Sequence, residues 1–113
     1  MKYFVQKGGD AVVVRISGSM VSSCQEELRV VCHDLLNISN LPLILDLSEV
    51  DFMDSSGLSQ CIELSRTKSS RGEMFACAGL NCSLKRLFHV SRADQRIRLY
   101  ASQREALSDL SSN

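Results

Sequence analysis

The chain has 113 residues, of which 44% are hydrophobic and 23% charged, as is typical of one soluble globular domain, and we expect residues 1–113 to form a single domain. Its 13 basic and 13 acidic residues cancel, which argues against a general attraction to nucleic acid or to an anionic membrane. No segment reaches the roughly 18 apolar residues of a membrane span, so we expect no membrane insertion. The 5 cysteines, odd in number and without a CxxC pair, favour a reducing cytoplasm over a disulfide framework.

A hairpin and a helix are predicted at the start of the chain. Residues 2–6 (KYFVQ) and 11–17 (AVVVRIS) are rich in β-branched and aromatic side chains, and a glycine-containing turn separates them, which predicts a β-hairpin. A helix from about Ser22 to Leu36 follows, because apolar residues recur there at the spacing of one helical face. These apolar residues are Cys24, Leu28, Val31, Cys32 and Leu35.

The centre of the chain alternates between short apolar strands and helices. Residues 41–47 (LPLILDL) are almost wholly apolar, as in a strand covered on both faces of a parallel sheet, and we expect that strand to end at Asp46. An acidic loop follows, and then a helix from Ser55 or Ser56 to about Ser69. The remaining predicted elements are a strand over 73–79, a helix over 83–90, a strand over 96–101 and a helix over 102–110.

The predicted order of elements is β-β-α-β-α-β-α-β-α. Strand–helix–strand repeats imply parallel crossovers, so only the first hairpin needs to be antiparallel. The sequence therefore predicts an α/β fold with a small mixed, mostly parallel sheet, an N-terminal β-hairpin and about four helices.

The stretch DFMDSSGL, residues 51–58, lies where the predicted loop leads into a helix. Two adjacent serines at such a junction allow three roles, namely helix cap, nucleophile or phosphate acceptor. A phosphate would be attracted by the free amides and partial positive charge of the helix N-terminus and repelled by nearby carboxylates. We expect these carboxylates to be Asp46, Glu49, Asp51 and Asp54. The combination suits a switch that alters a binding surface without unfolding the domain.

Catalytic and ligand-binding motifs are missing from the sequence. A catalytic serine needs a base within hydrogen-bond reach, and neither the G-x-S-x-G elbow nor a well-placed histidine is present, since we expect His33 and His89 to lie at the surface. The sequence also lacks a P-loop, a G-x-G-x-x-G fingerprint and clustered metal ligands. We therefore expect no enzyme activity, no metal and no cofactor.

Four segments together resemble the STAS domain, the family named for sulfate transporters and anti-sigma factor antagonists. The most specific is LILDLSEVDFMDSSGL, residues 43–58, which is similar to the family signature of an apolar strand, an acidic loop and an Asp-Ser-x-Gly-Leu turn into a helix. The others are VRISGSM (14–20), GEMFACAGLNCSLKRLFHVS (72–91) and RIRLYASQREAL (96–107). The resemblance covers nearly the whole chain and implies the STAS fold.

The resemblance also implies a function, that of an anti-sigma factor antagonist in a partner-switching system. In that family, the unphosphorylated domain binds an anti-sigma factor that is a serine kinase with a histidine-kinase-fold ATPase domain. Phosphorylation of the serine after the motif aspartate releases the partner, and a PP2C-type phosphatase restores the unphosphorylated form. The phosphate acceptor here would be Ser55. The residues expected to contribute to partner binding are Asp46, Asp54, Ser56, Gly57 and Leu58, with Ser56 also the expected helix cap.

Two alternatives keep the fold and change the role. The chain could be the STAS subunit of a lipid-transport ABC complex, in which the motif docks on the ATPase subunit without phosphorylation, or a scaffold in a larger stress-sensing complex. A serine hydrolase is the least favoured alternative, because no base is placed beside the serines.

Overall fold

The computed structural model describes residues 2–8 and 10–110, and within them one five-stranded sheet runs in the order β1-β2-β3-β4-β5. The strands are β1 (Lys2–Gly8), β2 (Ala11–Met20), β3 (Leu43–Met53), β4 (Phe75–Ala78) and β5 (Arg98–Tyr100). β1 and β2 are antiparallel and every other neighbouring pair is parallel, so the predicted mixed sheet with an N-terminal hairpin is confirmed. Gly9, expected in the hairpin turn, lies outside the described residues.

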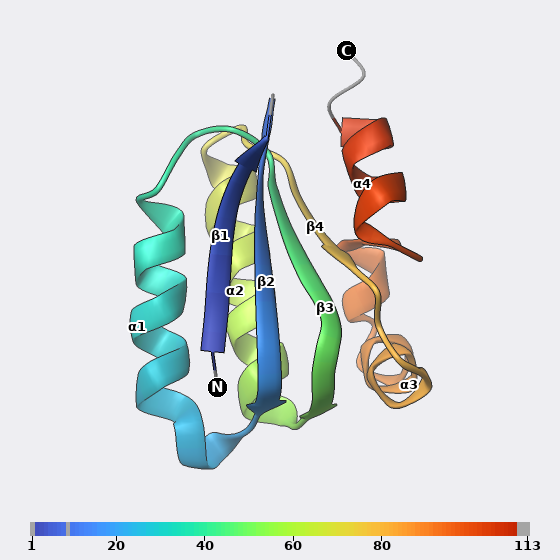
Figure 1. The fold of residues 1–113 in the computed structure, drawn as a ribbon. Helices are drawn as coiled ribbons and strands as arrows, with labels where there is room; N and C mark the ends of the chain where they lie inside the picture. The colour runs from blue at the N-terminus through green and yellow to red at the C-terminus, as the bar shows by residue number, and fades with distance from the viewer. Residues whose placement is uncertain (1, 9, 111–113) are drawn as a thin grey trace.

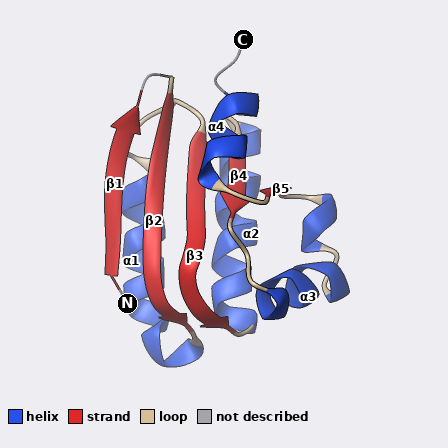
Figure 2. Ribbon diagram, turned by 45° about the vertical axis from the view of Figure 1, so that its right-hand side comes forward, coloured by secondary structure: helices blue, strands red, loops and turns tan. Residues whose placement is uncertain are grey.

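Helices cover both faces of this sheet (Figures 1 and 2). A short 3-10 turn, η1 (Ser22–Cys24), leads into α1 (Gln25–Leu36), which packs with α2 (Ser55–Ser70) on one face. α3 (Cys82–Val90) and the 3-10 turn η2 (Ala93–Gln95) follow β4, and α4 (Gln103–Leu110) lies on the opposite face. Within the described residues the number of helices is as predicted, and their bounds agree within one residue, except that α1 begins at Gln25, three residues after the expected start, because Ser22–Cys24 form η1.

The alternation of side chains along the strands divides the core into two parts. Val12 and Val14 of β2 point toward α1 and α2, together with Leu43 and Leu45 of β3, and form the larger aliphatic cluster. The intervening residues Ala11, Val13 and Ile44 pack with Ala106 and Leu110 of α4 on the other face. Both faces of β3 are therefore covered at its start, as the apolar sequence of that segment predicted.

The expected end of the third strand at Asp46 was wrong, because β3 continues to Met53. Residues 48–53, which we expected to form a loop, belong to this strand, and residues 49–53 pair with residues 17–20 of β2. The register shifts twice along this pairing, and Gly18 of β2 adopts a positive φ of 101° beside the second shift. These irregularities break the two-residue alternation of buried and exposed side chains, so the sequence there looks like a loop. β3 accordingly curves toward its carboxyl end (Figure 2).

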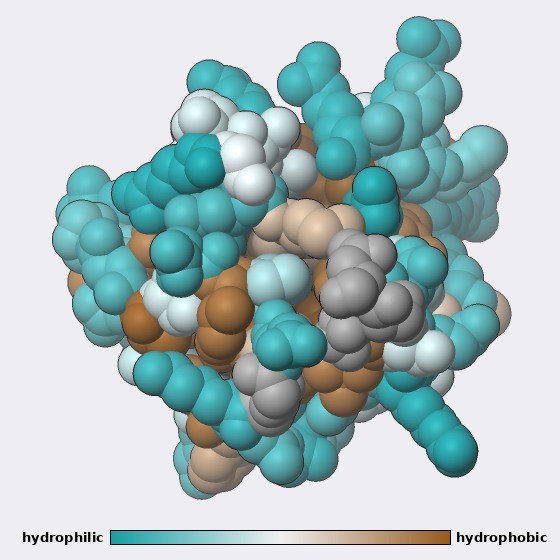
Figure 3. Space-filling model, turned by 90° about the horizontal axis from the view of Figure 1, so that it is seen from above, coloured by the Kyte–Doolittle hydropathy of each residue, from teal (hydrophilic) through white to brown (hydrophobic). Residues whose placement is uncertain are grey.

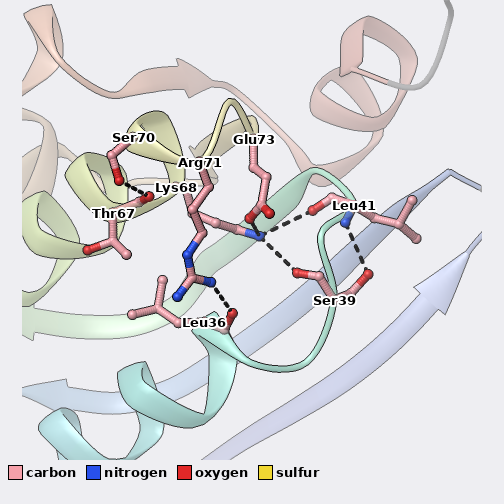
Figure 4. A network of polar contacts seen from close by, with 8 residues as sticks. All are labelled: Leu36, Ser39, Leu41, Thr67, Lys68, Ser70, Arg71 and Glu73. Atoms are coloured by element: carbon pink, nitrogen blue, oxygen red, sulfur yellow. Dashed lines mark hydrogen bonds and ion pairs between the residues drawn. The ribbon is translucent and has the colours of Figure 1, made fainter.

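The far end of α2 is fixed to the loop that enters β3 by a buried lysine (Figure 4). Lys68 is 0% exposed, and its Nζ lies 2.9 Å from the Glu73 carboxylate. The same ammonium group donates to the carbonyl oxygens of Ser39 at 3.1 Å and Leu41 at 3.4 Å. A buried ammonium group needs such partners, so this network holds α2 in place at the end of the helix that is remote from the Asp-Ser-Ser motif.

The two ends of the sheet present different chemistry. At the end where β1 turns into β2, the surface is mostly hydrophilic, with hydrophobic atoms visible between polar side chains (Figure 3). β2 and β3 finish at the opposite end, where α1 and α2 begin (Figure 1). The Asp-Ser-Ser motif lies at that second end, in the place where α/β proteins commonly carry functional residues.

Candidate functional site

The helix cap of α2 is Asp54. One carboxylate oxygen accepts hydrogen bonds from the backbone amides of Ser56 at 2.9 Å and Gly57 at 3.4 Å, and the Asp54 backbone is extended, as a cap requires. The prediction that Ser56 caps the helix was therefore wrong. The helix begins one residue earlier than Ser56, at Ser55, so the side chain that faces the free amides of the first turn is the carboxylate that precedes both serines.

The second oxygen of the Asp54 carboxylate reaches a different part of the chain. It accepts a 2.9 Å hydrogen bond from the backbone amide of Ser22, the first residue of η1. This bond from Ser22, together with those from Ser56 and Gly57, lowers the pKa of Asp54. Asp54 thereby connects the start of α2 to the segment that joins β2 to α1, a connection that sequence reasoning did not find because it depends on backbone geometry.

Ser55 occupies the first position of α2 and is exposed. Within the described part of the chain its hydroxyl makes no side-chain hydrogen bond, whereas its neighbour Asp54 is fully engaged. A group added to the Ser55 hydroxyl would therefore extend into solvent beside the free end of the helix. Ser56 is half-buried and less accessible than Ser55.

Gly57 and Leu58 face the interior. Leu58 is 6% exposed and belongs to the main core cluster. A Cβ atom built on Gly57 would lie 2.4 Å from the carbonyl oxygen of Met20 and 2.8 Å from a side-chain atom of Met53, so the glycine lets the first turn of α2 approach the ends of β2 and β3. These two residues fix the position of the helix start from within.

The carboxylates expected around the serines are spread along β3. Asp46 is 7% exposed and accepts a hydrogen bond from the Ser48 amide, and it lies eight residues, roughly 25 Å of extended chain, from Asp54. Glu49 pairs with Arg15 at 3.4 Å. Only Asp51, which accepts a hydrogen bond from Ser19, and Asp54 lie at the same end of the strand as the serines. The expectation that Asp46 and Glu49 lie beside the serines was wrong because the strand continues.

Asn81 is a further residue of this end that sequence reasoning missed. Its side-chain oxygen caps α3 by accepting from the Leu84 amide at 2.9 Å, and its side-chain nitrogen donates to the backbone oxygens of Val50 at 3.3 Å and Asp51 at 3.4 Å. Asn81 therefore fixes the start of α3 to the last part of β3. The capping bond to Leu84 could have been predicted, because asparagine is a common residue before a helix. No local sequence pattern predicts the two bonds to the backbone of β3.

The described part of the chain was also searched for metal sites, catalytic histidines and membrane-spanning helices. No group of three or more His, Cys, Asp or Glu residues there is arranged to hold a metal ion. His33 and His89 are exposed, and neither imidazole bonds a serine hydroxyl among the described contacts. None of the helices in residues 2–8 and 10–110 is long and apolar enough to cross a membrane.

Comparison with solved structures finds the same fold in anti-sigma factor antagonists and in a transporter. A putative anti-sigma factor antagonist from Thermotoga maritima matches with a TM-score of 0.86 and 22% identity, over 96% of this chain and 94% of the other. The Bacillus protein SpoIIAA matches in its unphosphorylated form with a TM-score of 0.79 and 17% identity, over 99% of this chain and 98% of the other, and it is also known in a phosphorylated form. The murine anion transporter Slc26a9 matches with a TM-score of 0.79 and 21% identity, over 96% of this chain but only 19% of the transporter.

A family model agrees with these structures and with the position of the motif. The model of the STAS domain matches residues 4–106, which include every strand from β2 to β5, all of α1, α2 and α3, and the Asp-Ser-Ser-Gly-Leu turn. Since that match covers most of the sequence, the chain belongs to the STAS domain family.

Proposed function

We propose that the chain is an anti-sigma factor antagonist that acts without catalytic activity, as a cytoplasmic protein–protein interaction module switched by phosphorylation of Ser55. Its partner is an anti-sigma factor serine kinase with a histidine-kinase-fold ATPase domain, and a PP2C-type phosphatase removes the phosphate. The observation that carries this proposal is the exposed Ser55 hydroxyl at the first position of α2, in the Asp-Ser-Ser-Gly-Leu turn of a STAS domain. SpoIIAA, a structural relative, is known in both phosphorylation states.

A phosphate on Ser55 changes the charge of this surface more than its shape. The amides of Ser56 and Gly57 already donate to Asp54, so the phosphate joins an end of the molecule that carries the Asp54 and Asp51 carboxylates. It adds close to two negative charges at pH 7. The phosphate and the two carboxylates together repel an acidic partner surface and alter the contacts with a neutral partner surface. The helix and its cap stay in place.

An apolar anchor accompanies the serine. Phe52 is 51% exposed and lies three residues before Ser55, at the end of β3. Exposed aromatic side chains are frequent energetic centres of protein interfaces. We infer that the kinase covers Phe52 together with Ser55, Asp54 and Ser56, and that Gly57, Leu58 and Asp46 contribute by positioning rather than by direct contact, because Leu58 and Asp46 are buried.

Phosphate mapping tests the assignment of Ser55. The chain is incubated with ATP and with each histidine-kinase-fold serine kinase encoded in the same genome, and the modified residue is identified by mass spectrometry. We expect phosphate on Ser55, no incorporation into Ser55→Ala and normal incorporation into Ser56→Ala, the matched control. Phosphate on another residue, or equal incorporation into Ser55→Ala, would contradict the assignment.

A second candidate is a docking domain of a transport system, such as the STAS subunit of a lipid-transport ABC complex, that works without a phosphate. The likeness to Slc26a9, in which the matching region is a small part of a transporter, favours this alternative. The two functions differ in their dependence on Ser55. Docking of Ser55→Ala and Ser55→Asp variants on a transporter ATPase subunit with unchanged affinity would support the second function over the first.

A further inference from the structure

The edge strand β1 exposes three consecutive apolar side chains. Tyr3 is 37% exposed, Phe4 61% and Val5 40%. β1 pairs with β2 on one side only, so the backbone groups along its other side have no strand partner among the described residues. Native proteins usually protect such an edge, because it is a template for another strand. In β1 the protecting residues are confined to the ends, where Lys2, Gln6 and Lys7 stand.

A groove adjoins this edge on the side of α1. Its volume is about 440 Å³, and Tyr3, Val30 and Val31 give it an apolar surface. Val30 is 56% exposed and lines the groove together with Tyr3, so the exposed apolar surface is shared by β1 and α1. Three carboxylates border the groove, and none of the described residues that line it is basic. They belong to Glu26, Glu27 and Asp34.

We propose that a second copy of this chain adds its β1 strand, antiparallel, to the exposed edge of β1, with Phe4 opposite Phe4. This register places Tyr3 opposite Val5 of the second copy and Lys2 opposite Gln6. Aromatic and β-branched pairs are among the favourable cross-strand pairs. A shift of the register by one residue would instead place Lys2 opposite Lys7, which is unfavourable because both are cationic.

Charge complementarity supports the same arrangement. Tyr3, Val5 and Lys7 pair with Ile16, Val14 and Val12, which belong to the core beneath α1 and α2, so their side chains lie on the α1 side of the sheet. In the antiparallel register, Lys7 of the second copy lies beyond Tyr3, near the start of β1. α1 also begins at that end of the sheet, as Figure 1 shows.

The acidic residues at the start of α1 would receive this lysine. Glu26 already pairs with Arg29 at 2.8 Å, whereas the Glu27 carboxylate has no partner among the described residues. Lys7 of each copy can therefore pair with Glu27 of the other. The two sheets become one continuous sheet, and Ser55, which follows β3 on the far side of β2, stays outside the interface. The inference thus stands apart from the proposed function.

Sedimentation velocity over a range of protein concentrations tests the proposal. We expect the 12.5 kDa chain to double its mass as its concentration rises. Val5→Lys should weaken self-association by about tenfold or more, because it places a third cation at the pairing edge. Val90→Lys is the matched control, since Val90 is 72% exposed on α3, and it should associate like the unchanged chain. A chain that remains monomeric at every concentration overturns the proposal and leaves the groove to a different, basic partner.

A charge exchange tests the register separately, because Lys7 and Glu27 are both exposed. Lys7→Glu and Glu27→Lys should each weaken the dimer, and the double variant should regain most of the lost association. Equal association of all three variants and the unchanged chain would overturn the register, and so would a double variant that is as weak as the sum of the two single changes.

Discussion

The carboxylate of Asp54 and the backbone amide of Ser22, 32 residues apart in the sequence, are joined by a 2.9 Å hydrogen bond. The same carboxylate caps α2, so the helix that presents Ser55 and the segment that precedes α1 share one acceptor group. A change of charge at Ser55 therefore occurs beside the group that connects these two segments.

The first prediction concerns the stability that Asp54 provides. The folded state lowers the pKa of Asp54, so the ionised carboxylate stabilises the fold at pH values above its unfolded pKa of about 4, and that contribution is lost as the pH falls through the folded pKa. Asp54→Ala should lower the Tm at pH 7, and the difference from the unchanged chain should shrink as the pH falls below about 4.

Thermal unfolding followed by circular dichroism between pH 7 and pH 3 measures this difference. Asp10→Ala removes a carboxylate that is exposed in the hairpin and should have little effect on the Tm at either pH. A Tm difference for Asp54→Ala that stays constant over the whole range would show that the charge of Asp54 does not act as described.

The second prediction concerns the close contact at Gly57. An alanine there would bring its Cβ to 2.4 Å from the Met20 carbonyl oxygen, a backbone atom that cannot move without disturbing β2. Although alanine is a better helix former, Gly57→Ala should lower the free energy of unfolding by about 1–3 kcal/mol, the usual effect of overpacking. Urea unfolding measures the change. Ser59→Ala, at an exposed position of the same helix, should be neutral or stabilising, and a stabilised Gly57→Ala would contradict the contact.

The third prediction concerns the buried ion pair at the far end of α2. Lys68→Met leaves the Glu73 carboxylate, whose side chain is 14% exposed, without its 2.9 Å partner, and it removes the Nζ donor from two partly buried carbonyl oxygens. We expect a loss of about 3 kcal/mol in the free energy of unfolding, because an uncompensated charge remains in the interior. The double variant Lys68→Met, Glu73→Gln should recover part of this loss. A double variant as unstable as the sum of the two single changes would count against the pairing.

The fourth prediction concerns cysteine reactivity. Burial, with a smaller contribution from nearby Cys61, raises the pKa of Cys32 to about 12, and a hydrogen bond with Cys61, together with burial, raises the pKa of Cys77. Cys82 alone is exposed among the five. Because thiolates are the reactive form, a disulfide reagent at pH 8 should modify Cys82 rapidly and the buried thiols only on unfolding. Cys82→Ser should remove the rapid phase, and rapid modification of Cys32 in the native protein would contradict the packing of α1.

Much of the fold could be predicted because most segments show one clear pattern of apolar residues, either that of a helix or that of a buried strand. The apolar spacing of α1 and the unbroken apolar run at the start of β3 gave the correct elements and the correct covering of the sheet. The second half of β3 could not be predicted, since its pairing with β2 contains register shifts, and side chains no longer alternate between buried and exposed. That error placed Asp46 and Glu49 beside the serines, whereas they lie far along the strand.

The sequence predicted which residues form the site better than it predicted their contacts. The pattern Asp-Ser-Ser-Gly marked the start of a helix, but which residue capped it depended on whether the helix began at Ser55 or at Ser56. The contacts of Asp54 with Ser22 and of Asn81 with β3 join segments about 30 residues apart, and no local sequence pattern reports such a contact.

The most direct test of the central proposal is the affinity of the partner kinase for two preparations of the chain. Isothermal titration calorimetry compares the unphosphorylated chain with the chain phosphorylated on Ser55, in the presence of ADP, so that the kinase cannot phosphorylate the chain during the titration. We predict that the phosphate weakens binding by about tenfold or more, because it adds close to two negative charges to the surface that the kinase covers. Equal affinity of the two preparations would contradict the account.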